Sequence, residues 1–309
     1  MTTRSALLAT TTSLALAAQT AMGAPADNTV IPLWPEGVPQ SGINLKVKTG
    51  SPAAVDPARE PSITYLKPAV DRAKGSAVIV IPGGGYSTVV TDREGTQYAR
   101  WLGTLGITGF VLNYRIKDYG HPAPLQDIAR AVRLVRSRAA EFGVLPDRIG
   151  AMGSSAGGHL AACAGTLFDH ADARTGAEID TVSARPDFLI LMYPVITFED
   201  PVAHAGSRVS LLGKAPTRKL LELLSAEKQV TARTPPTLLF HAQDDRTVPV
   251  ENSILFYQAL TRAKVPADMH LFQHGGHGFA MKRGFGSTSD WPTLAEAWLR
   301  EQGVIPSDR

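Results

Sequence analysis

The tightest constraint on the fold is a short stretch, residues 149–161, in which an apolar run turns directly into a helix of small residues. Within it, Gly153, Ser155 and Gly157 fit the Gly-x-Ser-x-Gly pattern of a nucleophile elbow, a strained strand-to-helix turn that exposes a serine hydroxyl. Glycine is needed on both sides because side chains there would collide with the neighbouring strand and helix. The pattern predicts Ser155 as a nucleophile, with the amide of Ala156 free to bind developing negative charge. The plain alternative is a Gly/Ser turn that caps a helix.

Composition and charge exclude several classes of protein. The 309 residues suit one large α/β domain, and 31 Lys and Arg against 28 Asp and Glu leave a net charge of only +3. Such a small excess argues against a basic patch, so we expect no nucleic-acid partner. The single cysteine, Cys163, cannot form an internal disulfide, and no Cys/His cluster has the spacing of a zinc site. The sequence therefore predicts neither a metal nor a cofactor.

The N-terminus has the layout of a secretory signal peptide: a charge at Arg4, an apolar run, and small residues up to Ala26. Cleavage after Ala26 is the first expectation and cleavage after Gly23 the second, while the alternative is a frayed N-terminus of a cytosolic protein. The apolar run is too short to span a bilayer, so we expect no membrane insertion once residues 1–26 are removed. The prediction is a secreted or periplasmic protein whose residues 27–309 form one domain.

Strand and helix patterns alternate along the rest of the chain. A Pro- and Gly-rich arm over residues 30–68 contains an alternating edge strand at 62–66. After it, continuous apolar runs predict buried parallel strands, and apolar residues three and four apart predict helices between them. Strands are expected at 77–81, 107–112, 148–152, 187–193, 237–241 and 268–272, and helices near 94–105, 124–142, 251–264 and 292–302. This order predicts a mostly parallel, doubly wound sheet with helices on both faces.

Local patterns predict further details of these helices. Thr91 and Glu94 have the spacing of a capping box, which would start the helix that follows them. The helix that begins at Pro124 carries one apolar stripe, and its four arginines are expected to form a solvated face. These arginines are Arg130, Arg133, Arg136 and Arg138. His121 and Asp127 are expected to order the loop before this helix.

Three consecutive glycines, Gly83, Gly84 and Gly85, directly follow the first buried strand. They allow a backbone turn whose amides point into a site, and a loop at this place can supply the second half of an oxyanion hole. We expect Gly84 or Gly85 to act with Ala156 in this way. The alternatives are a flexible turn or a phosphate cradle, but the loop lacks the full G-x-G-x-x-G pattern and the Lys-Ser/Thr of a P-loop.

Acidic residues and histidines follow the last two strands. Asp244 and Asp245 lie at the edge where α/β sheets bind ligands, although paired acids in a loop are usually solvated or capping. After the last strand, His277 has a glycine on each side and is a better candidate for a general base than His274, which lies nearer the strand. The chain order of Ser155, Asp245 and His277, each after the appropriate strand, is that of the α/β-hydrolase triad.

Several motifs give the chain a resemblance to a known family. They are Pro82-Gly83-Gly84-Gly85-Tyr86, Asn113-Tyr114-Arg115, His121-Pro122-Ala123-Pro124-Leu125-x-Asp127, Gly153-x-Ser155-Ala156-Gly157-Gly158-His159-Leu160, Asp245-x-x-Val248-Pro249 and Gly275-Gly276-His277-Gly278-Phe279. Over nearly all of residues 27–309 the chain resembles the α/β-hydrolase esterases related to acetyl-xylan and bifunctional feruloyl/acetyl-xylan esterases, and more loosely the hormone-sensitive-lipase group. The resemblance implies Asp245 as the acid in place of Asp244. This sequence departs from the looser relatives at Pro82, where they carry histidine. The choice of oxyanion donors among residues 84–86 therefore stays open.

The resemblance also implies a function. It is that of a serine esterase, without a cofactor, which removes short acyl groups, acetyl first, from a plant polysaccharide. Feruloyl esterase and general short-chain esterase or lipase are the alternatives, ahead of a serine peptidase or a non-catalytic binding protein of the same fold. The expected partner is thus a small ester or an acylated polysaccharide, and the sequence predicts no oligomeric state.

A long connection, residues 194–236, separates two predicted buried strands, and its length suggests an inserted cap over the site. Three residues are candidates for substrate contact: His204 and Arg208 from this insertion, and Tyr86 from the glycine loop. His159, on the predicted elbow helix, is instead expected to be a buried structural histidine.

Overall fold

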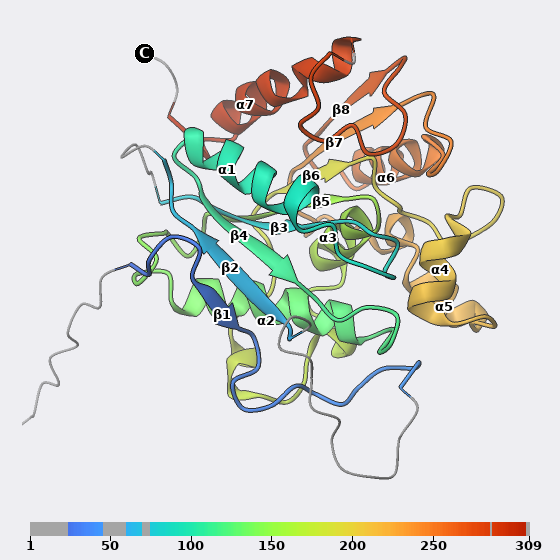
Figure 1. Cartoon of the computed structure of the whole chain (residues 1–309). Coiled ribbons are helices and arrows are strands. Elements are labelled where there is room, and N and C mark those ends of the chain that lie inside the picture. Colours follow the sequence, from blue (N-terminus) through green and yellow to red (C-terminus); the bar gives the residue numbers. More distant parts are fainter. Residues whose placement is uncertain (1–23, 46–59, 70–74, 285, 307–309) are drawn as a thin grey trace, which may run out of the picture.

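A mostly parallel sheet organises the chain, with helices packed on both of its faces (Figure 1). The computed structural model describes residues 24–45, 60–69, 75–284 and 286–306. The predicted signal segment, residues 1–26, lies outside the described residues except for its last three, so its removal stays a prediction.

The described residues form one eight-stranded sheet with the order β1-β2-β4-β3-β5-β6-β7-β8. Its strands are β1 (Val30–Pro32), β2 (Ser62–Leu66), β3 (Ala77–Ile81), β4 (Thr108–Asn113), β5 (Ile149–Ser154), β6 (Leu189–Met192), β7 (Thr237–Ala242) and β8 (Ala267–Phe272). β1, β2 and β4 pair antiparallel, and all other neighbours pair parallel. The predicted α/β fold with a mostly parallel sheet is confirmed. The prediction of an edge strand at 62–66 is wrong, because β1 pairs with β2 and takes the edge.

The helices are α1 (Gln97–Thr104), α2 (Ala123–Ser137), α3 (Ala156–Thr166), α4 (Ala205–Leu212), α5 (Arg218–Leu223), α6 (Glu251–Arg262) and α7 (Trp291–Glu301). They make two cores, one on each face of the sheet, because successive strand side chains point to opposite faces. In β3, Ile79 and Ile81 share a core with α2, α3 and α6, whereas Val78 and Val80 share the other core with α1 and α7. β3 is therefore buried on both faces, as its continuous apolar run predicts.

The arginines of α2 correct one prediction. Arg133 is a buried residue that donates to the carbonyl of Ala173 at 2.7 Å and pairs with Asp180 at 2.7 Å. Arg130 is buried as well and donates to the carbonyl of Leu33 at 2.9 Å. The predicted solvated face is therefore wrong for these two arginines, because segments distant in sequence cover the polar side of α2 and supply oxygen acceptors.

The insertion at residues 194–236 forms α4, α5 and a 3₁₀ turn, Ala226–Gln229. In Figure 1, α4 and α5 lie beyond the carboxyl ends of the central strands. The insertion is tied to the domain by a 2.9 Å bond from the amide of His121 to the carbonyl of Leu211 in α4. Its role as a cap stays a proposal.

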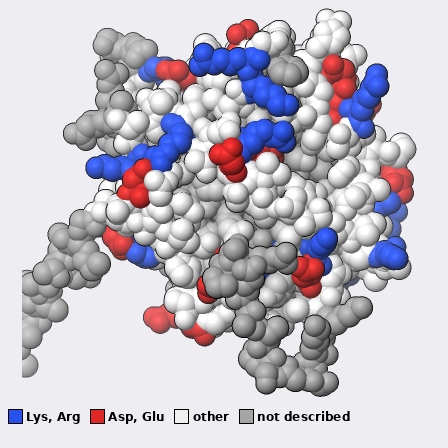
Figure 2. Space-filling view, viewed as in Figure 1, with Lys and Arg blue, Asp and Glu red and all other residues white. Residues whose placement is uncertain are grey.

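Charged side chains are spread over the face of the molecule shown in Figure 2, with Lys and Arg close to Asp and Glu over most of it. This distribution agrees with the small net charge of +3. Within the described part of the chain, no helix combines the length and the apolar character needed to cross a bilayer.

Candidate active site

The junction of β5 and α3 is a strained turn centred on Ser155, which has φ 54° and ψ −120°. A Cβ on Gly153 would lie 2.2 Å from the carbonyl oxygen of Gly157, and a Cβ on Gly157 would lie 2.1 Å from that of Ile81. Neither distance is sterically allowed, so both positions require glycine. The turn holds a serine in a conformation that non-glycine residues seldom adopt, and such strain is concentrated at functional sites.

Ser155, His277 and Asp245 come together at the carboxyl edge of the sheet, just after β5, β8 and β7. Ser155 Oγ lies 2.9 Å from Nε2 of His277, and Nδ1 of His277 lies 2.7 Å from Oδ2 of Asp245. A carboxylate can only accept, so Nδ1 carries the ring proton and Nε2 accepts from the serine hydroxyl. The His277 side chain is 20% exposed and that of Asp245 is fully buried. The acid is thus shielded while the imidazole stays within reach of a substrate.

Buried groups around Asp245 keep it ionised. Its Oδ1 accepts from the amides of Thr247 at 2.8 Å and Val248 at 2.9 Å, and Nε2 of buried His241 lies 3.3 Å from Oδ2. Burial by itself raises the pKa of Asp245, but the hydrogen bonds from His241 and His277, the charge of His277 and the Val248 amide outweigh burial. Together they hold the pKa of this carboxyl well below its usual range. His241 is a supporting residue that the sequence patterns do not single out.

The neighbouring pair, Asp244 and His274, lies outside this arrangement. Asp244 Oδ1 accepts a 2.8 Å bond from the amide of Gly276, and Oδ2 lies 3.4 Å from Nδ1 of His274. The His274 side chain is 73% exposed. Both residues therefore brace the loop that carries His277, and neither contacts Ser155.

The glycine loop after β3 lies against the elbow. A Cβ on Gly83 would be 3.0 Å from Cβ of Ser155. Residues 84–86 all have positive φ, at 131°, 63° and 56°. Among the described residues, the amides of residues 84–86 and of Ala156 find no hydrogen-bond acceptor. Unpaired amides beside a nucleophile are the groups that a developing oxyanion needs, and the choice among them stays a prediction.

Glu94 is buried behind the glycine loop and does not form the predicted capping box. Thr91 makes no side-chain cap bond, and Asp92–Thr96 form a π-helical turn that leads into α1. Glu94 Oε2 accepts from the amide of Gly83 at 3.0 Å, and Oε1 accepts from the hydroxyl of Tyr193 at 3.1 Å. The capping-box prediction is therefore wrong, because this carboxylate reaches the loop instead of its own helix start.

From Glu94 a chain of hydroxyl groups continues to the elbow. The hydroxyl of Tyr193 lies 3.1 Å from that of Tyr98, to which Ser154 Oγ donates at 3.4 Å. The ring of Tyr193 also packs edge-on against His277, with centroids 5.0 Å apart. One buried carboxylate thus links the glycine loop, the elbow and the histidine. The sequence carries one hint of this buried carboxylate, the neighbouring Gly95. A Cβ on Gly95 would lie 2.8 Å from Cγ1 of Val111, so the turn that carries Glu94 lies tightly against the sheet.

Tyr86 is fully buried and does not present its side chain to a substrate. Its hydroxyl lies 2.7 Å from Nδ1 of His159, whose Nε2 lies 2.7 Å from the carbonyl of Leu224. A carbonyl only accepts, so Nε2 is protonated and Nδ1 accepts from Tyr86. Burial lowers the pKa of His159 to about 4. His159 is a buried neutral link between the glycine loop and the insertion, and only the backbone of Tyr86 is left for a role in the site.

The two candidates in the insertion differ. Arg208 donates to the carbonyl of Phe198 at 2.9 Å and pairs with Asp200 at 3.2 Å. These bonds direct its guanidinium to the loop before α4, which argues against the predicted substrate contact. His204 is half-buried at the start of α4, and its pKa is lowered by burial and by the charge of His277. His204 therefore lies near the site, and its contact with substrate stays a prediction.

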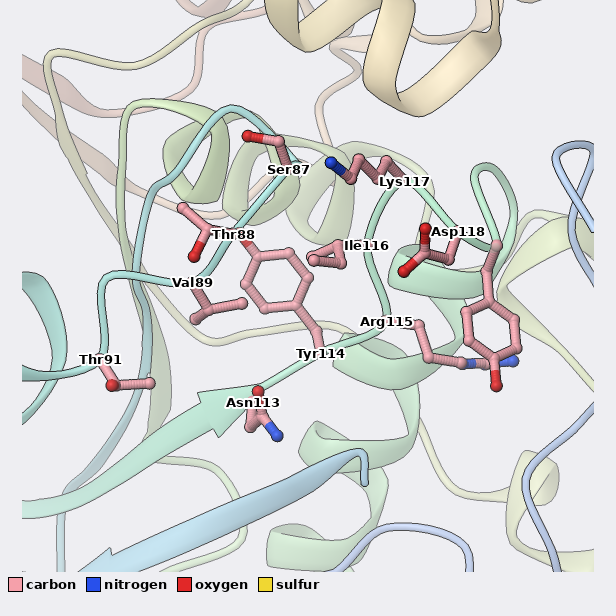
Figure 3. Close-up of a pocket in the computed structure, with 11 residues that line it drawn as sticks. Ser87, Thr88, Val89, Thr91, Asn113, Tyr114, Arg115, Ile116, Lys117 and Asp118 are labelled. Atoms are coloured by element: carbon pink, nitrogen blue, oxygen red, sulfur yellow. The ribbon is translucent and has the colours of Figure 1, made fainter. Parts of the chain in front are cut away.

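A cavity of about 540 Å³ opens beside the glycine loop (Figure 3). Its walls come from residues 87–91, after β3, and residues 113–119, at the end of β4. The amide of Lys117 donates to the carbonyl of Tyr86 at 2.8 Å, so the two walls are joined at the glycine loop. The cavity thus adjoins the segments that flank and brace the loop proposed to bind an oxyanion.

Solved structures define the class of the protein. The acetyl ester-xyloside bifunctional hydrolase from Caldicellulosiruptor lactoaceticus is similar, with a TM-score of 0.80 and 39% identity over 90% of this chain and 98% of that chain. The carboxylesterase Cest-2923 from Lactobacillus plantarum has a TM-score of 0.69 and 27% identity over 85% of this chain and 100% of that chain. Fold and relatives together define a serine ester hydrolase of the α/β-hydrolase class.

The family follows from a sequence model. The model described as BD-FAE matches residues 64–260, and the chain belongs to this family. The acetylxylan esterase of Xylanibacter ruminicola is 35% identical over 237 residues, which are 75% of this chain and 45% of that protein. The chain therefore spans less than half the length of this relative. The resemblance drawn from the motifs is confirmed.

Proposed function

We propose that the protein is a carbohydrate esterase that removes short acyl groups, acetyl first, with Ser155, His277 and Asp245 as its catalytic residues. The observation that carries the proposal is the unbroken series from Ser155 Oγ to Nε2 of His277, at 2.9 Å, and from Nδ1 to Asp245, at 2.7 Å. Unpaired amides flank the same serine. A nucleophile, a base and an orienting carboxylate in hydrogen-bond reach suit acyl transfer.

In the proposed first half-reaction, Ser155 Oγ attacks the ester carbonyl carbon while Nε2 of His277 takes the hydroxyl proton. The carbonyl oxygen becomes an oxyanion, which the amides of Ala156 and of Gly84 or Gly85 would stabilise. Asp245 stays ionised and stabilises the imidazolium. The tetrahedral intermediate then collapses: the bond to the alkoxy oxygen breaks, and the imidazolium gives its proton to the departing alcohol.

In the second half-reaction, water attacks the acyl-enzyme while His277 Nε2 accepts a proton from it. The new tetrahedral intermediate releases the carboxylic acid, and the proton returns to Ser155 Oγ. No redox step is required. The side-chain protons of His277 and Ser155 therefore end each turnover where they started.

The printed names of two relatives, an acetylxylan esterase and an acetyl ester-xyloside hydrolase, support acetylated saccharides as the substrate class. Hydrolysis of p-nitrophenyl acetate, butyrate and octanoate tests the acyl preference, and kcat/KM is expected to fall steeply toward octanoate. Acetate release from acetylated xylan is expected to exceed acid release from tributyrin. Faster turnover of octanoate and tributyrin would replace this proposal with a general lipase, and faster turnover of methyl ferulate with a feruloyl esterase. Ser155→Ala is the blank for every substrate.

Export is proposed from the signal-like start of the sequence. Expression of the full chain in a secreting host, followed by intact-mass measurement of the exported protein, tests it. The expected mature protein begins at Asp27, or at Ala24 if the second cleavage site is used. An exported protein that retains residues 1–23 would contradict a cleaved signal.

A further inference from the structure

The cavity of about 540 Å³ is lined by residues that directly follow the proposed oxyanion loop, together with residues at the end of β4. Its walls begin at the carboxyl ends of β3 and β4, neighbours in the sheet, and α/β sheets bind ligands at this edge. The wall after β3 is pressed against the loop, since a Cβ on Gly84 would lie 2.2 Å from the carbonyl oxygen of Thr88. A ligand in the cavity would therefore lie beside the loop that is proposed to bind the oxyanion of the ester.

The lining of the cavity offers polar groups around an aromatic floor. Figure 3 shows the ring of Tyr114 between Val89 on one wall and Ile116 on the other, with hydroxyl, amide and ammonium groups around them. The Tyr114 hydroxyl donates to the carbonyl of Pro82 at 2.8 Å, which fixes the ring beneath the glycine loop. Tyr114 itself is buried, so it fixes the base of the cavity, and the polar groups around it suit sugar hydroxyls.

Four of these polar groups have no partner among the described residues: the hydroxyls of Thr88 and Thr91, the carbonyl oxygen of the Asn113 side chain, and the ammonium of Lys117. Arg115 contrasts with them, because its guanidinium is held by Asp127 and is part of the wall. An acyl chain in the cavity would desolvate the four free groups without replacing their hydrogen bonds, which is unfavourable. A saccharide would replace those bonds.

Resting on the proposed function, we propose that this cavity is a subsite for the sugar residues next to the acylated sugar. The saccharide exchanges hydrogen bonds with Thr91, Asn113 and Lys117 while its ester carbonyl is at Ser155. The volume falls within the roughly 300–1,000 Å³ of small-molecule sites, enough for a short oligosaccharide. The cavity therefore selects for the carrier of the acyl group, whereas the elbow performs the chemistry.

The experiment compares one substrate that reaches the cavity with one that does not. Acetylated xylotetraose is assayed against p-nitrophenyl acetate in the full-length protein and in two variants, Thr91→Val and Lys117→Met. Each substitution removes a hydrogen bond to the saccharide, which is worth roughly a factor of 3–10 in kcat/KM. The kcat/KM for acetylated xylotetraose, divided by that for p-nitrophenyl acetate, is therefore expected to fall by roughly a factor of 3–10. The loss is expected in the KM for the saccharide and not in kcat.

Lys67→Met is the matched control. Lys67 is exposed, and it follows β2, which runs antiparallel to β4, so it lies away from the carboxyl ends of β3 and β4 where the cavity opens. Its ratio is expected to equal that of the wild type. If Thr91→Val and Lys117→Met also leave the ratio unchanged, the cavity is not a saccharide subsite, even though the esterase proposal stands. If the wild type does not hydrolyse p-nitrophenyl acetate, the proposed function itself fails. Binding of unmodified xylotetraose to Ser155→Ala, measured by calorimetry and weakened by Lys117→Met, gives a second readout that needs no turnover.

Discussion

Asp245 and Asp127 are both fully buried carboxylates that accept several hydrogen bonds, yet their partners differ. Asp127 accepts from the indole of Trp34 at 2.8 Å and from the backbone amide and guanidinium of Arg115 at 2.7 and 2.8 Å. The Arg115 side chain is only 1% exposed, so this cluster is closed. Asp245 faces His277, whose imidazole is 20% exposed and contacts Ser155.

The difference separates a structural charge cluster from a reactive one. An arginine stays protonated in proteins, so the Arg115–Asp127 pair can fix a geometry but cannot move a proton. An imidazole can both accept and donate a proton, and His277 has a hydroxyl on one side and a carboxylate on the other. Burial of a charge therefore does not identify a reactive site by itself. A proton-exchanging partner within reach of a substrate does.

The largest effect is expected at the reactive cluster. Ser155→Ala should lower kcat for p-nitrophenyl acetate by about 10⁵–10⁶-fold, because triad members act as a unit. Ser154→Ala is the matched control: its hydroxyl donates to that of Tyr98, at 3.4 Å, instead of to His277, and its loss should cost less than about tenfold. Steady-state kinetics with thermal unfolding of both variants makes the comparison. An equally deep loss in Ser154→Ala would contradict the assignment of the nucleophile.

The closed cluster should respond in stability. Arg115→Ala leaves Asp127 buried without its cation, and the free energy of unfolding should fall by about 3–5 kcal/mol. Urea denaturation measures the loss. The control is Arg100→Ala, which breaks a pair with Asp27 whose side chains are 44% and 38% exposed, and this change should cost no more than about 1 kcal/mol. Equal costs for the two variants would mean that the buried pair is not a structural element.

His159 is expected to make the folded protein less stable at acid pH. Burial lowers its pKa to about 4 in the folded protein, whereas an unfolded histidine takes up its proton near pH 6.5. The unfolded chain therefore binds more protons between these values, and the free energy of unfolding should fall by up to about 3 kcal/mol as the pH drops from 6.5 to 4. Urea denaturation over this range should give a shallower pH slope for His159→Gln than for the wild type. Identical slopes would show that His159 does not carry the effect.

A smaller effect is expected where Glu94 links the glycine loop to the elbow. Glu94→Gln keeps an acceptor for the Gly83 amide but weakens a charge-assisted bond, so kcat should fall about tenfold with little change in KM. Glu141→Gln, which alters a partly exposed pair with Arg138, is the control. A rise in KM with kcat unchanged would assign Glu94 to substrate binding instead of loop positioning.

The sequence predicts the residues of the candidate site because their patterns are local. Ser155 lies between glycines that steric contact requires, and Asp245 and His277 each follow a buried strand, so chain order alone places them at one edge. Which of two adjacent acids contacts the histidine is less local, and the family resemblance was needed to favour Asp245 over Asp244. In the structure, His277 contacts Asp245, whereas Asp244 accepts from the amide of Gly276.

The wrong predictions for the arginines of α2 and for the capping box both involve partners that lie far away in the sequence. An apolar stripe on α2 shows which side faces the sheet, but it does not show that the segment around Asp180 covers Arg133 on the other side. The spacing of Thr91 and Glu94 likewise describes one helix start, whereas the hydroxyl that Glu94 accepts belongs to Tyr193. Polar side chains that make long-range contacts show no periodicity in the sequence. Local patterns therefore assign them to solvent or to their own helix.

The most direct test of the contrast between the two clusters is a pair of substitutions measured in both activity and stability. Asp245→Asn should lower kcat for p-nitrophenyl acetate by about 10⁴-fold, because the histidine loses its orienting carboxylate. Asp127→Asn should instead lower the free energy of unfolding by about 3–5 kcal/mol, and its folded fraction should keep kcat within about threefold of the wild type. Comparable losses of kcat in the two folded variants would contradict the account, as would full activity in Asp245→Asn.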